Sequence, residues 1–261
     1  MPIRARVDGN VGVIVLSQPA RRNALDHASW LALRDAARGM PEIRALVVVG
    51  DGPDFCSGLD LADDNPLLRD LASAVRSGDD SVARRAIGEL KDCVSALADL
   101  QVPTFAAIEG ACVGGGLEIA LACDVRIAAR SAILALPEVR LGMIPEMGGC
   151  ARLPRLVGPG RAAALVTTGR RVQGEEAFAL GLVERVCDTG QALATAMAAA
   201  AAVAANGPQA VRLALAAVRV SLDLGLDEAL SVETNHGALA LTSGEAVEGL
   251  AAFREGRPPR W

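Results

Sequence analysis

The sequence predicts an α/β protein whose last quarter is helical. Short β-branched runs alternate with segments of helical apolar spacing up to about residue 187. From Ala192 onward the chain is Ala-rich and typical of helix, with a break at Asn206. Apolar residues make up 51% of the 261 residues and charged residues 22%, which is enough for a sizeable core. We therefore expect an α/β core over residues 1–187 and a helical region over 188–261 that completes the fold and forms an oligomer interface.

The core is expected to begin with a β-hairpin. Residues 3–7 and 11–16 are rich in β-formers and flank the turn-forming residues 8–10. A helix should follow Asp26, which is a suitable N-cap and precedes apolar side chains at helical spacing. The β-branched run Ala45–Val49 lies between glycine-containing turns and predicts a buried strand.

The middle of the chain predicts one irregular segment and then further helices and strands. Residues 63–81 are polar without a clear period, which predicts a mobile loop or frayed helix over a site. A long helix is expected from about Val82 to Leu100. Strands are expected over Thr104–Ile108 and Val125–Ala129, with a glycine cluster and a helix between them.

Composition excludes several classes of partner. The net charge of −5 comes without a long basic or acidic block, which argues against nucleic-acid and membrane-surface binding. Two Trp, four Phe and no Tyr leave few side chains for stacking on bases. No run approaches the ~20 apolar residues of a membrane span, and the N-terminus does not resemble a signal peptide.

The six cysteines predict neither a disulfide framework nor a metal site. They are scattered, with no CxxC pair and no Cys/His cluster at zinc-ligand spacing. We interpret them as small buried apolar residues and expect a reducing, cytoplasmic compartment.

Two glycine-containing motifs predict exposed backbone donors. In DFCSGLDL, Gly58 permits a sharp turn at positive φ that leaves N–H groups pointing outward. In GACVGGGLEIA, the glycines at 114–116 open a helix whose first N–H groups have no partner within the helix, which suits an anion. Each cluster alone could equally be a tight turn required by packing.

A third motif places acids in an apolar stretch. In LPEVRLGMIPEMGG, prolines immediately precede Glu138 and Glu146. Burial of such carboxylates is costly unless they are solvated, paired or functional. The three motifs together therefore indicate a site with backbone donors and acids.

In order and spacing, these motifs resemble the crotonase (enoyl-CoA hydratase/isomerase) superfamily. RRNALD near the start and LTSGEAVEGLAAFREGRPPRW at the end extend the resemblance over almost the whole chain. It implies a spiral of ββα units, a C-terminal helical trimerisation region and a CoA thioester substrate. It further implies a homotrimer or dimer of trimers, no metal or nicotinamide, and no cofactor beyond the coenzyme A of the substrate.

The resemblance also implies roles for particular residues. The backbone N–H groups of Leu59 and Gly115 should form an oxyanion hole for the thioester carbonyl. Glu118 should be the base that activates water, and Glu138 the acid that protonates the α carbon. The alternative for Glu118 is a solvated first-turn residue that interacts favourably with the helix dipole.

Glu146 departs from the hydratase pattern, which has glycine there. A third carboxylate looks like dienoyl-CoA isomerases, although those enzymes usually carry Asp at the position of Glu118. The leading hypothesis is therefore syn addition of water to a trans-2-enoyl-CoA, and the nearest rival is isomerisation of an enoyl- or dienoyl-CoA. A non-catalytic acyl-CoA-binding protein is a third possibility, against which Glu118 and Glu138 argue.

Further residues are expected to bind the acyl-CoA. By position in the family motifs they are Arg22, Ala24, Leu25, Ser57, Gly58, Asp60, Leu61, Gly114, Pro137 and Leu141. Ala62 stands where hydratases often have lysine, so the residues that bind the CoA phosphates are not identified.

Two other enzyme classes fit poorly. The glycines between 110 and 116 do not form GxGxxG, and no acid lies at the ribose distance of a dinucleotide-binding unit. Ser57 is not in a GxSxG elbow, and the two histidines, His27 and His236, are typical of surface or helix-cap positions.

Overall fold

The strands of the computed structural model, which describes residues 1–62 and 65–261, form two sheets. The larger has the order β1-β2-β3-β4-β6-β9, with β1 and β2 antiparallel and the other neighbours parallel. The smaller has the order β5-β7-β8. The strands are β1 (Ile3–Asp8), β2 (Val11–Leu16), β3 (Ala45–Gly50), β4 (Thr104–Ile108), β5 (Ala111–Val113), β6 (Val125–Ala129), β7 (Ile133–Ala135), β8 (Val172–Gln173) and β9 (Arg185–Cys187).

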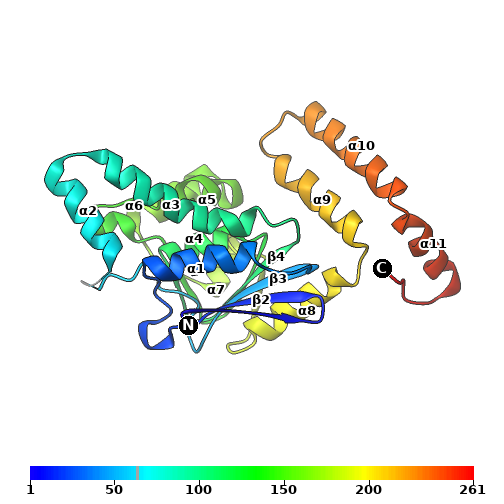
Figure 1. Ribbon diagram of the computed structural model, residues 1–261, viewed down its shortest axis with the longest axis horizontal. Coiled ribbons are helices and arrows are strands. Elements are labelled where there is room, and N and C mark those ends of the chain that lie inside the picture. The colour runs from blue at the N-terminus through cyan, green and yellow to red at the C-terminus, as the bar shows by residue number, and fades with distance from the viewer. Residues whose placement is uncertain (63–64) are drawn as a thin grey trace.

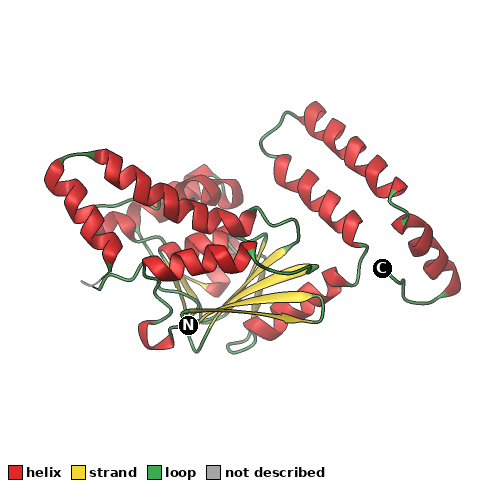
Figure 2. Ribbon diagram, in the orientation of Figure 1, coloured by secondary structure: helices red, strands yellow, loops and turns green. Residues whose placement is uncertain are grey.

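Helices cover both faces of the larger sheet and extend beyond it at the C-terminal end (Figures 1 and 2). The α-helices are α1 (His27–Arg38), α2 (Pro66–Ser77), α3 (Asp80–Ala98), α4 (Gly115–Ala122), α5 (Gly149–Val157), α6 (Pro159–Thr168), α7 (Gly174–Leu180), α8 (Ala192–Ala204), α9 (Pro208–Val220), α10 (Leu226–Thr242) and α11 (Glu245–Glu255). Two 3₁₀ helices are η1 (Pro19–Arg21) and η2 (Glu138–Leu141). The expected α/β class is confirmed.

Successive turns of the chain stack as a spiral of ββα units. One turn runs from β4 in the larger sheet through β5 in the smaller sheet to α4, and the next runs through β6 and β7 to η2. Parallel pairing of β4 with β6 and of β5 with β7 stacks the two turns in register. An isolated parallel bridge between Cys56 and Cys112 joins the preceding turn to this stack. The spiral that the family resemblance implies is therefore present.

The N-terminal elements form where local signals predict them. Gly9 and Asn10 connect β1 and β2, and Asp8 pairs with Val11 across the turn. The Asp26 carboxylate accepts a hydrogen bond from the backbone N–H of Ser29 at 2.9 Å and so caps α1. The strands expected at 45–49, 104–108 and 125–129 correspond to β3, β4 and β6.

The expectation of a loop or frayed helix over 63–81 is wrong for most of that segment. Residues Pro66–Ser77 form α2, and the Asn65 side chain caps it by accepting from the N–H of Leu67 at 3.2 Å. Leu67 and Ala74 are buried and lie on one helix face, seven residues apart. Charged residues between them obscured this period. Residues 63 and 64 of the expected loop lie outside the described part of the chain.

Alternate residues of the larger sheet enter two different cores. Val13 and Val47 face α8, whose alanines at 192, 196, 200 and 204 form a stripe of small side chains against the sheet. Ile14 and Val48 face the opposite way, toward a cluster that includes residues of α1, α3 and α4. Because alanine allows a helix to approach closely, α8 packs as part of the core.

Helices α9, α10 and α11, which we call the C-terminal arm, project away from the sheets (Figure 1). The side chains of Leu241, Val247 and Phe253 on the arm are 72%, 72% and 85% exposed. The helical region thus has two parts, α8 against the sheet and the arm beside it. The expected division at residues 187 and 188 remains a prediction.

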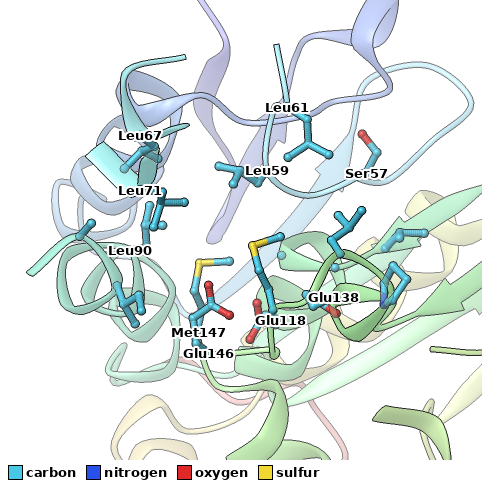
Figure 3. A pocket seen from close by; sticks show the side chains of 18 residues that line it. Ser57, Leu59, Leu61, Leu67, Leu71, Leu90, Glu118, Glu138, Glu146 and Met147 are labelled. Atoms are coloured by element: carbon cyan, nitrogen blue, oxygen red, sulfur yellow. The ribbon is translucent and has the colours of Figure 1, made fainter. Parts of the chain in front are cut away.

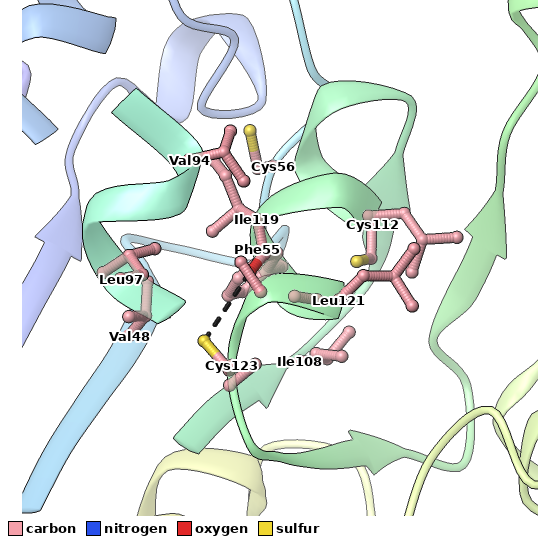
Figure 4. Packing of buried hydrophobic residues seen from close by; sticks show 14 of the residues in the cluster. Val48, Phe55, Cys56, Val94, Leu97, Ile108, Cys112, Ile119, Leu121 and Cys123 are labelled. Carbon is pink, nitrogen blue, oxygen red and sulfur yellow. Dashed lines mark hydrogen bonds between the residues drawn. The ribbon is translucent and has the colours of Figure 1, made fainter. Parts of the chain in front are cut away.

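Most cysteines fill the core as expected (Figure 4). Cys56, Cys112 and Cys123 are buried, and the Cys123 thiol donates to the Ile119 carbonyl at 3.6 Å. Burial raises the pKa of Cys56 and of Cys123 to about 12, so both remain thiols. Cys150 is exposed, however, which corrects the expectation of burial for that residue. None of the described helices is long and apolar enough to cross a bilayer.

Candidate active site

The motif residues converge on a cavity of about 230 Å³ (Figure 3). Its walls come from the turn after β3, from α2 and α3, from the glycine cluster that opens α4, and from η2 and the loop after it. The lining residues are Ser57, Leu59, Leu61, Leu67, Leu71, Ala86, Ile87, Leu90, Val113, Gly114, Gly115, Glu118, Pro137, Glu138, Leu141, Met143, Glu146 and Met147.

Two backbone segments meet in the wall of this cavity. Gly58 has φ +92°, and a Cβ added there would lie 2.8 Å from the Val113 carbonyl oxygen and 3.0 Å from the Gly115 nitrogen. The turn at 57–59 is therefore in contact with the start of α4. Only glycine combines this positive φ with so close an approach.

Backbone hydrogen bonds with Leu25 hold the peptide groups on either side of Leu59. The N–H of Leu25 donates to the Gly58 carbonyl at 2.8 Å, and the N–H of Asp60 donates to the Leu25 carbonyl at 2.9 Å. Leu59 lies between these two bonds. Among the described residues, the N–H groups of Leu59 and Gly115 have no protein acceptor, so both can donate to a ligand in the cavity.

Glu118 lies in the first turn of α4 and is buried, with 1% of its surface exposed. This rules out the alternative of a solvated surface residue. One carboxylate oxygen accepts from the N–H of Gly149 at 2.8 Å. Burial raises the pKa of Glu118 to about 8, the hydrogen bond from Gly149 opposes this, and the charges of Glu138 and Glu146 add to it.

Glu138 begins η2 on the other side of the cavity. Both of its carboxylate oxygens are buried, and neither has a hydrogen-bond partner among the described residues. A Cβ placed on Gly114 would lie 3.2 Å from one of these oxygens, so the carboxylate adjoins the glycine cluster. Burial raises the pKa of Glu138 to about 7, with a further contribution from the charge of Glu146. An unpartnered buried carboxylate of this kind is typical of a catalytic group.

Glu146 also lines the cavity, on the loop between η2 and α5. In Figure 3 its carboxylate lies on the α3 side of Glu118, whereas Glu138 lies on the opposite side. Burial raises the pKa of Glu146 as well. Glu146 thus shares the cavity with Glu118 and Glu138, and its catalytic role stays a prediction.

Glu118 and Glu138 together have the electrostatics of an acid–base pair. With pKa values near 8 and 7, one ionised and one neutral carboxyl can coexist near pH 7. The higher pKa of Glu118 favours Glu118 as the neutral acid and Glu138 as the base, which is the reverse of the expected roles. The hydrogen bond from Gly149 favours ionised Glu118, as the expected role as base requires. The division of roles therefore stays a prediction.

The remaining predicted residues divide into two groups. Ser57, Leu61, Gly114, Pro137 and Leu141 line the cavity. The cavity lining does not include Arg22, Ala24, Leu25, Gly58 and Asp60.

The second group shapes the turn beneath the cavity. The Arg22 guanidinium binds the Asp54 carboxylate, with Nε 2.8 Å from Oδ2, and Arg21 pairs with the carboxylate of Asp60. Ala24 and Leu25 are buried. Contacts of these residues with CoA remain predictions.

The apolar side of the cavity was missed from the sequence. Leu67 and Leu71 of α2 and Ala86, Ile87 and Leu90 of α3 form it. The available signal was the i, i+4 spacing of Leu67 with Leu71 and of Ala86 with Leu90. Because 63–81 was interpreted as irregular, the spacing of Leu67 with Leu71 received no weight. Ala86 and Leu90 lie in the helix that was expected from Val82, but they were not assigned to a site.

Asn23 is a second residue that the sequence did not single out. It is fully buried at φ +55°, and its amide nitrogen donates to the carbonyls of Asp51 at 3.0 Å and Asp54 at 2.7 Å. Its side-chain oxygen accepts from the N–H of Gln18 at 2.8 Å. The signal was an Asn in a loop, since Asn tolerates the left-handed region better than most residues.

The raised pKa of Glu118 predicts a pH-dependent gain of stability in Glu118→Gln. A carboxyl whose pKa rises from 4.5 to about 8 on folding destabilises the fold increasingly between these pH values, because the folded state holds the proton more tightly. Each pKa unit corresponds to about 1.4 kcal/mol. Urea denaturation should therefore show the variant gaining, relative to the parent, on the order of 2 to 4 kcal/mol between pH 5 and pH 8.

The exposed Glu42 supplies the matched control for this measurement. Glu42→Gln should change the free energy of unfolding by a similar amount at both pH values. A stability difference for Glu118→Gln that does not grow with pH would contradict the raised pKa.

No group of three or more His, Cys, Asp and Glu among the described residues is arranged to hold a metal ion. The expectation that the protein needs neither metal nor a separate cofactor remains a prediction.

Comparison with known proteins agrees with this geometry over the whole chain. The family model described as enoyl-CoA hydratase/isomerase matches residues 6–261. A crotonyl-CoA hydratase from Syntrophomonas wolfei is 34% identical over 252 residues, covering 95% of this chain and 92% of that protein. The mitochondrial methylglutaconyl-CoA hydratase of Mus musculus is 33% identical over 269 aligned positions, covering 99% of this chain and 82% of that protein.

Solved structures give the same result. The crystal structure of an enoyl-CoA hydratase from Bacillus anthracis matches with a TM-score of 0.90 and 34% identity, covering 100% of this chain and 99% of that one. The chain belongs to the enoyl-CoA hydratase/isomerase family, and hence to the crotonase superfamily.

Proposed function

We propose that the protein is an enoyl-CoA hydratase that adds water across the 2,3 double bond of a trans-2-enoyl-CoA in fatty-acid or related acyl-CoA metabolism. The observation that carries this proposal is the pair Glu118 and Glu138, which line one cavity with pKa values near neutrality beside two available backbone donors. Relatives named as hydratases support the reaction type. Buried acids at the site argue against a non-catalytic acyl-CoA-binding role.

In this proposal the thioester oxygen accepts hydrogen bonds from the N–H groups of Leu59 and Gly115. They stabilise the enolate-like charge that develops as water adds, and loss of one such donor typically costs about 3 to 4 kcal/mol. The ionised glutamate takes a proton from water as the oxygen bonds to the β carbon. The neutral glutamate gives its proton to the α carbon, so the total charge of the pair is unchanged.

A second candidate function is isomerisation of an enoyl- or dienoyl-CoA, and Glu146 is the observation that favours it. Its carboxylate lines the same cavity as Glu138. Two acids on either side of a bound diene could remove a proton at one end and return it at the other.

Glu146→Gly, assayed on crotonyl-CoA and on a 3,5-dienoyl-CoA, distinguishes the two functions. For a hydratase we expect hydration to be preserved or raised, because the change removes a negative charge and bulk from the cavity. For an isomerase we expect isomerisation to fall by roughly 100-fold or more while thioester binding persists.

Glu146→Gln is the matched variant, since it keeps the size of the side chain and the backbone. Two results together would overturn the hydratase proposal. The parent would turn over the dienoyl-CoA faster than crotonyl-CoA, and both variants would lose isomerisation. Hydration retained in both would support it.

We also propose that the C-terminal arm forms the interface of a homotrimer or dimer of trimers. The exposed apolar side chains of Leu241, Val247 and Phe253 support this, because association would remove them from water. A cytoplasmic location and the lack of nucleic-acid and membrane partners stay predictions.

A further inference from the structure

The cavity is chemically two-sided. Leu67, Leu71, Ala86, Ile87 and Leu90 form a continuous apolar surface on one side, which we call the α2–α3 wall. The three glutamates are the charged members of the lining, and among the described lining residues there is no Lys, Arg or His. In Figure 3 the leucines of the wall lie together on the left, and Glu146 lies between them and Glu138 in this view.

The size of the cavity exceeds what the reacting atoms alone need. Its volume of about 230 Å³ compares with roughly 10 to 15 Å³ for one water in a cavity. The double bond of an enoyl group must lie by Glu118 and Glu138, next to the donors of Leu59 and Gly115. A four-carbon chain has a single methyl group beyond that bond, so it would leave the wall largely in contact with water.

On the basis of the proposed hydratase reaction, we propose that the α2–α3 wall selects an uncharged aliphatic acyl chain longer than four carbons. The same cavity rejects acyl groups that carry a free carboxylate in addition to the thioester. Each methylene that reaches the wall leaves water for an apolar surface, which is worth about 0.8 kcal/mol or roughly 4-fold in kcat/KM.

Rejection of a free carboxylate on the acyl group follows from the charges of the lining residues. The described lining offers no cationic partner, and Glu118, Glu138 and Glu146 already share the space. An additional anion would lose its hydration and meet like charges, both of which disfavour binding. The inference separates this chain from its 33% identical relative named methylglutaconyl-CoA hydratase, since a methylglutaconyl group carries a free carboxylate.

Ala86 is the position that tests the wall. It is the smallest side chain of the five and lies one helical turn before Leu90 on α3. Ala86→Phe would place a ring in the space that a longer chain needs. Val75→Phe is the matched control, because Val75 lies on α2 with 83% of its surface exposed and is not among the lining residues.

The experiment measures kcat/KM for trans-2-enoyl-CoAs of four, six and eight carbons and for methylglutaconyl-CoA. For the parent and for Val75→Phe we expect a rise of about 10-fold or more from four to eight carbons. We expect values for methylglutaconyl-CoA at least about 100-fold below the best substrate. In Ala86→Phe the eight-carbon value should fall far more than the four-carbon value, which removes or inverts the preference.

A parent that prefers the four-carbon substrate, or that hydrates methylglutaconyl-CoA as well as the eight-carbon substrate, would overturn the inference. An unchanged chain-length ratio in folded Ala86→Phe would overturn it too, and the smaller change Ala86→Leu repeats the test if Ala86→Phe does not fold.

Binding of saturated acyl-CoAs separates this inference from the reaction. Calorimetry with butyryl-CoA and octanoyl-CoA needs no turnover. Tighter binding of octanoyl-CoA that Ala86→Phe abolishes would support the wall even if no enoyl-CoA were hydrated, in which case the hydratase proposal alone would fail. Equal binding of the two ligands would count against the wall whatever the reaction proves to be.

Discussion

Glu138→Gln is expected to lower kcat for hydration by roughly 100-fold to 10,000-fold while acyl-CoA affinity stays near that of the parent. Both carboxylate oxygens of Glu138 are buried without a protein partner, so the change to an amide breaks no hydrogen bond of the described residues. It removes the ability to exchange a proton with water or the α carbon. The loss should therefore fall on the chemical step and not on binding.

The pH profile gives this test a readout that a folding defect would not produce. The proposed hydration needs one ionised and one neutral carboxyl, so the activity of the parent should fall on the acid side of about pH 7 and on the alkaline side of about pH 8. The residual activity of Glu138→Gln should lose one of these limbs. Glu42→Gln is the control, and near-parent turnover in Glu138→Gln would show that the role assigned to Glu138 is wrong.

Gly58→Ala is the second substitution for which we expect a large effect, a fall in kcat of about 100-fold to 1,000-fold. The added Cβ would lie 2.8 Å from the Val113 carbonyl and 3.0 Å from the Gly115 nitrogen, so the turn must move away from α4. That movement would misalign the N–H groups of Leu59 and Gly115, which point at one oxygen in the proposed oxyanion hole. Because both donors are backbone groups, displacement of the turn is the most direct way to test them.

Gly190→Ala provides a control for backbone strain alone. Gly190 has φ +84°, close to the φ of Gly58, but a Cβ there meets no atom within 4 Å. Both variants should lose some stability in thermal melts, since alanine is strained at positive φ. Only Gly58→Ala should lose turnover, and a folded Gly58→Ala with parent-like kcat would argue against an oxyanion hole at this turn.

Secondary-structure elements could be predicted from the sequence where the residues that determine them lie close together in the chain. The Asp26 cap, the hairpin at Gly9 and the strands at 45–49 and 104–108 follow from signals within a few residues, and they are observed. Helix α2 has the same kind of signal in Leu67, Leu71 and Ala74, but intervening charges outweighed it. A polar segment can still be a helix when one face is buried.

The site shows the same limit over longer distances. Glu118, Glu138 and Glu146, which were singled out from the sequence, line one cavity, and their catalytic roles stay predictions. No local pattern could show that Gly149 donates to Glu118 across 31 positions, or that Asp54 engages Arg22 across 32. Such contacts exist only after the turns of the spiral have stacked.

The stacked spiral also links occupancy of the site to folding of the whole core. The cavity draws on the turn at 57–59, the start of α4 and the chain at 138–147, which belong to successive turns held together by parallel strand pairing. Parallel pairing joins residues far apart in sequence, so it forms slowly and cooperatively. The complete lining is therefore assembled only when successive turns of the spiral have stacked. A ligand that fills the cavity would contact several of these turns at once. Binding of such a ligand should then raise the free energy of unfolding of the whole core. Removal of the ligand should lower it, instead of loosening a single loop.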